Sequence, residues 1–327
     1  MRRYFLGVDT GATKSHALIV DETGRALGFG RGGPGNWEGV GWGGTRAVLE
    51  AIIGQALAMA GIGLPELTAA GFGLAGYDWP EDREPHAAII RSLGLTCPFE
   101  LVNDALLGLL AGASAGWGVV VVAGTGCNCY GRDAQGRIGR VTGGGGRFGE
   151  HAGANELVSQ AIRAVALAWT QRGPATRLTE AFLEVTGARD PTDLLAGLVR
   201  GRYQLPASYA RLVFEVAKED QVACDIIVWA GRELGGLANS VIQQLGLQAM
   251  PLEVILSGSL YDGGSALTEA MGQTIHALAP QAQLVRLGTL PVVGAALLAA
   301  EQGRVAAAEL RPAVVASTPA LAGIGRD

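Results

Sequence analysis

The fold is decided by residues 4–14, which read YFLGVDTGATK. An apolar run leads into a glycine turn, and a second apolar run follows at residues 15–20. This order predicts two β-strands joined by a hairpin. Because Gly11 lets the backbone turn sharply, we expect N–H groups and the Thr13 hydroxyl to point into one hollow, which suits phosphate oxygens.

Asp9 stands at the end of the first of these strands. Hard cations such as Mg²⁺ prefer carboxylate oxygens and keep several of their waters. We therefore expect Asp9 to hold Mg²⁺ through water. An ordinary hairpin with a glycine turn is the plain alternative.

The same order of apolar strand and glycine turn recurs 113 residues later, counted from Gly11 to Gly124. The strand 118–123 runs into Gly124-Thr125-Gly126, and residues 133–137 mirror the turn at residues 21–25. This repetition predicts an α/β chain with an internal duplication of architecture. Two backbone nests at equivalent places favour a polyphosphate ligand, although neither loop has the Walker A pattern.

Asp104 follows the apolar strand 98–102 and Asn103, and a helical pattern continues over 105–113. A kinase that acts on an alcohol needs a carboxylate within hydrogen-bond reach of the attacking hydroxyl. Asp104 is the predicted general base. The alternative is a cap of the following helix, and both roles are compatible because a helix dipole keeps a cap carboxylate ionised.

A third turn, Ser257-Gly258-Ser259, follows the apolar strand 252–256. It predicts a further approach of the backbone to the ligand, under the nucleoside. The alternative is a strand-to-helix turn with a serine as the helix N-cap.

The remaining pattern alternates strands and helices and becomes helical from 155 to 248. The Gly-rich stretch 143–149 predicts a loop, and residues 292–302 predict a helix. The Ala-, Pro- and Gly-rich tail after Arg311 is expected to be loosely ordered.

Composition excludes several classes of protein. The net charge is −5 without a Lys/Arg block, which argues against nucleic-acid or membrane-surface binding. No apolar run reaches the roughly 18 residues that span a bilayer, and the apolar stretch before Asp9 is too short for a signal peptide. We expect a cytoplasmic protein. Cys127 and Cys129 predict small side chains flanking Asn128, with a metal site as the alternative.

Taken in order over residues 4–300, these motifs resemble the sugar-kinase/actin/Hsp70 superfamily. Within it, the chain resembles the N-acetylglucosamine kinase group, which is placed with the BadF/BadG/BcrA/BcrD-type ATPases. The matching segments are residues 7–14, 33–36, 103–105, 124–129, 143–146 and 257–259.

The resemblance implies an α/β fold of two ribonuclease-H-like (actin-like ATPase) domains with an interdomain cleft. The expected limits are 1–115, with the C-terminal helix after about 290 as an optional addition, and 116–327 with a helical insertion. ATP and Mg²⁺ are the implied cofactors and a hexose 6-phosphate is the product. The implied partner is a small sugar, and a homodimer is left open.

The resemblance also assigns roles to single residues. Asp104 is the implied base and Asp9 the metal residue. The implied nucleotide contacts are Gly11, Thr13, Lys14, Gly124, Thr125, Gly126, Gly258 and Ser259. The implied sugar contacts are Asn36, Asn128, Gly144, Gly145, Glu150 and His151.

Two positions depart from the family pattern. Gly145 stands where the family usually has Trp, and His151 stands where it has the acid that binds sugar hydroxyls. Loss of a buried hydrogen-bonding partner changes selectivity strongly. Glu150 after a one-residue shift, or Trp37 or Arg147, could supply other contacts.

Two other functions are alternatives to a sugar kinase. One is an iron–sulfur ATPase activator that uses the thiolates of Cys127 and Cys129. The other is a sugar or nucleotide sensor without turnover, against which Asp104 weighs. The sequence favours an ATP-dependent amino-sugar kinase, with N-acetylglucosamine or glucosamine as the acceptor.

Overall fold

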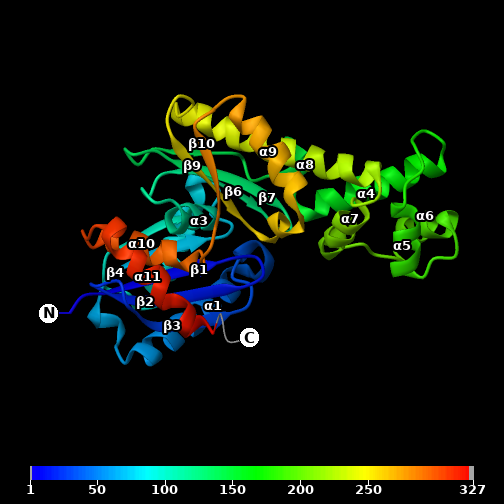
Figure 1. Ribbon diagram of the computed structural model, residues 1–327. Helices are drawn as coiled ribbons and strands as arrows, with labels where there is room; N and C mark the ends of the chain where they lie inside the picture. Colours follow the sequence, from blue (N-terminus) through cyan, green and yellow to red (C-terminus); the bar gives the residue numbers. More distant parts are fainter. Residues whose placement is uncertain (1, 324–327) are drawn as a thin grey trace. The chain divides into compact units, whose positions relative to one another are not determined.

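The computed structural model describes residues 2–323, which contain two five-stranded sheets with helices (Figure 1). This confirms the α/β class. Two compact units are distinguished, one of residues 1–120, 130–138 and 285–327 and the other of 121–129 and 139–284. The C-terminal segment from Val285 groups with the first unit. The domain limits 1–115 and 116–327 stay a prediction.

The first sheet has the strand order β3-β2-β1-β4-β5. Its strands are β1 (Tyr4–Thr10), β2 (Ser15–Asp21), β3 (Ala26–Gly32), β4 (Leu67–Leu74) and β5 (Phe99–Asn103). β1 pairs antiparallel with β2 as the predicted hairpin, and parallel with β4, which pairs parallel with β5. Parallel strands need crossover segments, which the helices of this unit supply.

Helices cover both faces of this sheet. The helices of the first unit are α1 (Trp37–Ala60), α2 (Arg83–Ser92), α3 (Asp104–Gly112), α10 (Val292–Gln302) and α11 (Ala307–Ala322). Alternation along β1 divides the core: Leu6 and Val8 pack toward α1 and α2, whereas Phe5 packs toward α10 and α11. In Figure 1, α10 and α11 lie across the second of these faces.

Glycine permits the close approach of α10. A Cβ on Gly7 would lie 2.3 Å from the Ala296 backbone nitrogen. The same helix meets α3, because a Cβ on Gly294 would lie 2.1 Å from the Leu107 carbonyl oxygen. β1 and α3 are therefore held by one buried helix whose small residues let backbones touch.

The expectation of a loosely ordered tail after Arg311 is wrong for residues 312–322, and residues 324–327 lie outside the described part of the chain. Residues 307–322 form α11 although Pro312 and Pro319 lie inside it. Its side chains Leu310 and Val314 are buried against the sheet, and tertiary packing of such a face outweighs the helix-breaking tendency of proline.

The second sheet has the order β10-β9-β6-β7-β8. Its strands are β6 (Gly118–Ala123), β7 (Cys127–Arg132), β8 (Ile138–Arg140), β9 (Leu252–Ser257) and β10 (Ala282–Arg286). The helices of this half are α4 (Ala154–Trp169), α5 (Leu178–Thr186), α6 (Pro191–Val199), α7 (Ala210–Val216), α8 (Gln221–Leu245) and α9 (Ser265–His276). α8 and α9 lie side by side, and α4 to α8 account for the helical pattern predicted from 155 to 248 (Figure 1).

Short 3₁₀ turns connect several of these elements. They are Leu64–Glu66, Pro80–Asp82, Gly145–Phe148, Ala207–Tyr209 and Ser259–Gly263. In the described part of the chain, no helix is both long enough and apolar enough to cross a bilayer.

Candidate active site

Three strand ends of the first sheet bring the predicted polar residues together. In the register of β1, β4 and β5, Thr10 is the partner of Leu74, and Leu74 is the partner of Asn103. Parallel strands deliver their carboxyl ends to one edge of a sheet. Asp9 and Asp104 therefore lie at the same edge, as the position of each at a strand end predicts.

Asn103, not Asp104, caps helix α3. Its backbone is extended, and its Oδ1 accepts a hydrogen bond from the Ala105 N–H at 3.0 Å. The alternative in which Asp104 is the cap is thus wrong. Asn103 therefore fills the capping position, and Asp104 is the first residue of the helix.

The carboxyl group of Asp104 has an unusual pKa. Burial raises it from 3.8 to about 7, and the carboxylates of Asp9 and Asp78 add to the rise, although backbone N–H groups of Ala105 and Asp104 oppose it. The expectation that the helix dipole keeps this group fully ionised is wrong, because desolvation and like charges outweigh the dipole. A pKa near 7 is what a general base at neutral pH requires.

The loop after β4 contributes a residue that the sequence reasoning missed. Asp78 accepts a hydrogen bond on Oδ1 from Asn103 Nδ2 at 3.0 Å, and Tyr77 O accepts another from the same nitrogen at 3.1 Å. The amide of Asn103 therefore clamps this loop to the start of α3. The strand-end argument that selected Asp9 and Asp104 applies equally to Asp78, which follows β4.

Asn36 serves as the N-cap of α1. Its Oδ1 accepts from the Glu38 N–H at 3.0 Å, and its Nδ2 donates to the Glu38 carboxylate at 3.2 Å. It lies against Gly76, where a Cβ would come within 2.6 Å of Oδ1. The predicted sugar contact is thus near the loop that carries Asp78, with its side chain already bonded locally.

The surroundings of Asp9 fit a hydrated cation. Asp9 is 9% exposed, and its carboxylate lies 3.9 Å from Nδ1 of His16. Within residues 2–323, the buried atoms Thr10 Oγ1 and His16 Nδ1 have no hydrogen-bond partner. Buried polar atoms are normally satisfied, often by water, and Mg²⁺ keeps its waters.

The hairpin loop between β1 and β2 is only partly the predicted nest. The Gly11 N–H donates to the Lys14 carbonyl at 3.0 Å, so this group closes the hairpin. Thr13 and Lys14 are exposed, which leaves their side chains accessible to a phosphate.

In the second unit, the loop Gly124-Thr125-Gly126 joins the start of α4. The N–H groups of Ala154 and Asn155 donate to the carbonyls of Gly124 and Thr125 at 2.9 and 3.0 Å. A Cβ on Gly124 or Gly126 would meet nothing within 4 Å. The loop thus has open space beside a helix N-terminus, where anions bind favourably.

The turn after β9 packs against the end of β6. Gly258 has φ +109°, and a Cβ there would lie 2.2 Å from the Ala123 carbonyl oxygen, so only glycine fits. Ser259 begins a 3₁₀ turn whose N-cap is Gly258, and no side-chain cap is made. The alternative in which a serine caps a helix here is wrong.

A cavity of about 320 Å³ opens beside this turn in the second unit. Its wall includes Ala154, which bonds to the Gly124 loop, so the cavity adjoins that loop. Its volume falls in the range of small-molecule sites. The lining residues are Ala154, Ala207, Ser208, Ala210, Arg211, Phe214, Ser259, Leu260, Asp262 and Gly263.

The loop of the predicted sugar contacts is organised by Glu150. Its buried carboxylate accepts from the N–H groups of Thr142 at 2.5 Å and Gly145 at 3.3 Å. Glu150 therefore stabilises the loop backbone. His151 is half-buried, with its ring 6.1 Å from that of Trp229.

Asn128 lies on β7, between the two cysteines. Its Oδ1 accepts from the Cys129 N–H at 2.8 Å, and its side chain is half-buried.

The two cysteines of β7 are thiols. Burial, followed by the carboxylates of Glu156 and Glu150, raises the pKa of Cys127 to about 12, and burial raises that of Cys129 well above its usual value. The Cys127 Sγ donates to the His151 carbonyl at 3.1 Å. Within residues 2–323, no group of three or more His, Cys, Asp or Glu side chains is placed to hold a metal ion.

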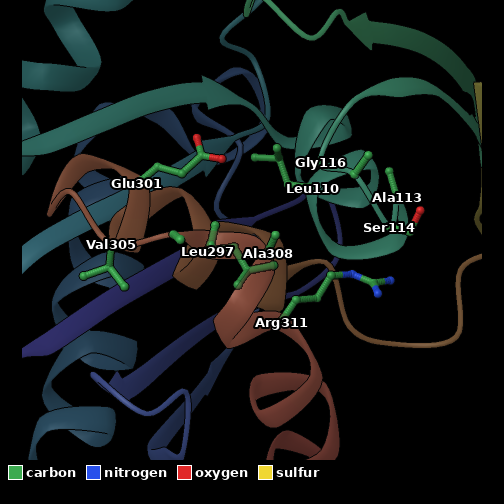
Figure 2. A pocket seen from close by; sticks show the side chains of 12 residues that line it. Leu110, Ala113, Ser114, Gly116, Leu297, Glu301, Val305, Ala308 and Arg311 are labelled. Carbon is green, nitrogen blue, oxygen red and sulfur yellow. The ribbon is translucent and has the colours of Figure 1, made fainter.

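A second cavity, of about 380 Å³, lies in the first unit between the end of α3, α10 and α11 (Figure 2). Its two charged groups are already bonded: Arg311 donates to the carbonyls of Ala111 and Gly112, and Glu301 pairs with Arg132. Its lining includes none of the predicted site residues.

Comparison with known proteins identifies the family. The model of the BadF/BadG/BcrA/BcrD ATPase family matches residues 6–299. The chain belongs to this ATPase family. The resemblance inferred from the motifs is thus confirmed.

Relatives of this ATPase family member include named kinases. It is 28% identical over 300 residues to the N-acetylmuramic acid/N-acetylglucosamine kinase of Clostridium acetobutylicum, covering 91% of this chain and 98% of the relative. It is equally identical over 318 residues to the N-acetyl-D-glucosamine kinase of Dictyostelium discoideum, with the same coverage.

Among solved structures, it resembles a Chromobacterium violaceum protein that carries the provisional name N-acetylglucosamine kinase. The TM-score is 0.68 at 25% identity, over 90% of this chain and 98% of that one. These findings bear out the expectation of an ATP-dependent phosphotransferase.

Proposed function

We propose that this protein transfers the γ-phosphoryl group of ATP to the 6-hydroxyl of an amino sugar. N-acetylglucosamine is the first acceptor to test and glucosamine the second. The observation that carries the proposal is Asp104, a carboxyl group with a pKa of about 7 at the edge where β1, β4 and β5 end. The kinase names of the relatives supply the substrate class.

In this mechanism the Asp104 carboxylate accepts the proton of the sugar hydroxyl as its oxygen attacks the γ-phosphorus. The bond between this phosphorus and the bridging oxygen of ADP breaks, and the proton leaves Asp104 to water after product release. Positioning and electrostatics supply most of the acceleration in such transfers. Asn103 contributes by fixing the start of α3, and with it the backbone of Asp104.

The nucleotide contacts are proposed for both units. The loop at Gly124–Gly126 and the turn at Gly258–Ser259 would hold the phosphates and the nucleoside, supported by their open backbone and the adjoining cavity. Thr13 and Lys14 would add contacts from the hairpin. Asp9 would hold Mg²⁺ through water, and the ion would neutralise phosphate charge.

The sugar contacts are proposed as the sequence predicts them, except that Glu150 is assigned a different role. Asn36, Asn128, Gly144, Gly145 and His151 stay direct candidates. Glu150 is expected to act by holding the loop, since its oxygens already accept two backbone hydrogen bonds. A homodimer and a cytoplasmic location stay predictions.

A coupled ADP-release screen tests the proposal. It compares N-acetylglucosamine, glucosamine, N-acetylmuramic acid, N-acetylmannosamine and glucose with a sugar-free control. The Asp104→Ala variant should bind ATP and sugar but turn over about 10²–10⁴ times more slowly. Equal turnover in the variant would refute Asp104 as the base. ATP and sugar binding without ADP release in the native protein would favour the sensor alternative.

A further inference from the structure

One aromatic side chain in the predicted sugar loop is exposed. Phe148 ends the 3₁₀ turn Gly145–Phe148, and 62% of its surface is accessible. A single exposed apolar residue is ordinary on a protein surface. Phe148, however, lies in the sequence between Gly144 and His151, both of which are candidates for sugar contact. Its exposed ring is therefore a candidate for contact with a ligand.

The ring of Phe148 rests on the backbone of Gly144. A Cβ on Gly144 would lie 2.2 Å from Cδ2 of the ring, so any larger residue would displace it. Gly145 adds no side chain, and a Cβ there would meet nothing within 4 Å. The Phe148 ring therefore packs on Gly144 and leaves the space beside Gly145 open.

The turn that carries the ring is fixed from beneath. The Glu150 carboxylate accepts from Gly145 N–H, and the Glu150 N–H donates back to the Gly145 carbonyl at 3.2 Å. The Gly149 N–H donates to the Gly146 carbonyl at 3.2 Å. A ring held on a pre-formed turn loses little backbone entropy when a ligand covers it.

The large aromatic rings nearest the other candidate sugar contacts already have partners. Trp37 stacks on Trp42 with centroids 4.4 Å apart and an angle of 3°, and its Nε1 donates to Gly76. Trp229 is half-buried beside His151. Phe148, by contrast, leaves 62% of its surface accessible.

We propose that Phe148 packs against the apolar face of the acceptor and the methyl group of its N-acetyl substituent, and so favours N-acetylated over free amino sugars. This rests on the proposed sugar-kinase function and specifies its acceptor. The physical basis is burial of apolar surface: the acetyl methyl gains contact with the ring, whereas the charged ammonium of glucosamine loses water there.

The test is steady-state kinetics of Phe148→Ala with N-acetylglucosamine and glucosamine. Aromatic packing of this kind changes binding by about three- to tenfold. We expect the KM for N-acetylglucosamine to rise by that factor, with the KM for ATP unchanged and glucosamine less affected. Phe148→Trp should retain the preference. Gly144→Ala, which displaces the ring without removing it, should resemble Phe148→Ala.

The matched control is Val199→Ala, which removes an exposed apolar side chain (88% accessible) on α6. An active native enzyme with unchanged N-acetylglucosamine KM in Phe148→Ala would overturn this inference alone. A change of oligomeric state in Phe148→Ala with unchanged sugar KM would overturn it in favour of an interface. No ADP release by the native enzyme with any sugar would overturn the proposed function instead.

Discussion

Replacing Asp104 with Asn should make the protein less active and more stable at neutral pH. In the folded chain, burial and the carboxylates of Asp9 and Asp78 raise the Asp104 pKa from 3.8 to about 7. Between these two pH values the native state holds a proton that the unfolded state has released. The native state therefore loses stability as the pH rises, because its carboxyl group must either keep the proton or ionise unfavourably.

The size of the effect follows from the shift. About three pH units at about 1.4 kcal/mol each give an upper value of about 4 kcal/mol. Asp104 is half-buried, and solvent screening lowers this value, so we expect about 2–4 kcal/mol. Asn has nearly the same shape and no charge. Its stability advantage over the native protein should thus grow from pH 4 to pH 7 and stay constant above pH 7.

The assay is urea unfolding of the ligand-free proteins at half-unit steps from pH 4 to pH 8, followed by circular dichroism. Asp225→Asn is the control, because that side chain is exposed on α8 and bonded to Gln221. It should show no such pH-dependent gain. A difference between Asp104→Asn and the native protein that is independent of pH would refute the reasoning about Asp104.

Three further variants test other parts of the structure. Thr13→Val should raise the KM for ATP more than that for sugar; the reverse ranking in initial-rate kinetics would count against a phosphate contact. Asn103→Ala removes the cap of α3 and should lower the free energy of unfolding by about 1–2 kcal/mol, with Asn103→Ser, which keeps a capping oxygen and adds no charge beside Asp78, restoring part of it in denaturant titrations. Gly258→Ala places a Cβ 2.2 Å from the Ala123 carbonyl and should weaken ATP binding in calorimetry, whereas unchanged affinity would show that the turn can shift.

Most of the secondary structure follows from local patterns. The hairpin of β1 and β2 and the helix at 292–302 lie where apolar periodicity and glycine turns predict them. The tail is the exception. Pro312 and Pro319 predict loose order, but α11 forms because Leu310 and Val314 are buried on the sheet, a contact that no local pattern reveals.

The positions of Asp9 and Asp104 near strand ends could be predicted from the sequence. Asp9 lies one residue before the end of β1 and Asp104 directly follows β5, and the parallel pairing of β1, β4 and β5 brings those ends to one edge. Local sequence could not distinguish Asn103 from Asp104 as the cap, since both residue types cap helices well. The role of Glu150 within its loop was also hidden, because it depends on where Thr142 and Gly145 lie after folding.

The sequence by itself determined the family, the alternation of strands and helices, and the residue types available for chemistry, because apolar periodicity and turn glycines act over short distances. Only the tertiary structure decided the burial, the hydrogen bonds and the pKa of those residues. The pKa of Asp104 depends on burial and on Asp9 and Asp78, which are 95 and 26 positions away along the chain. Electrostatic interaction depends on distance in space, and folding alone sets that distance.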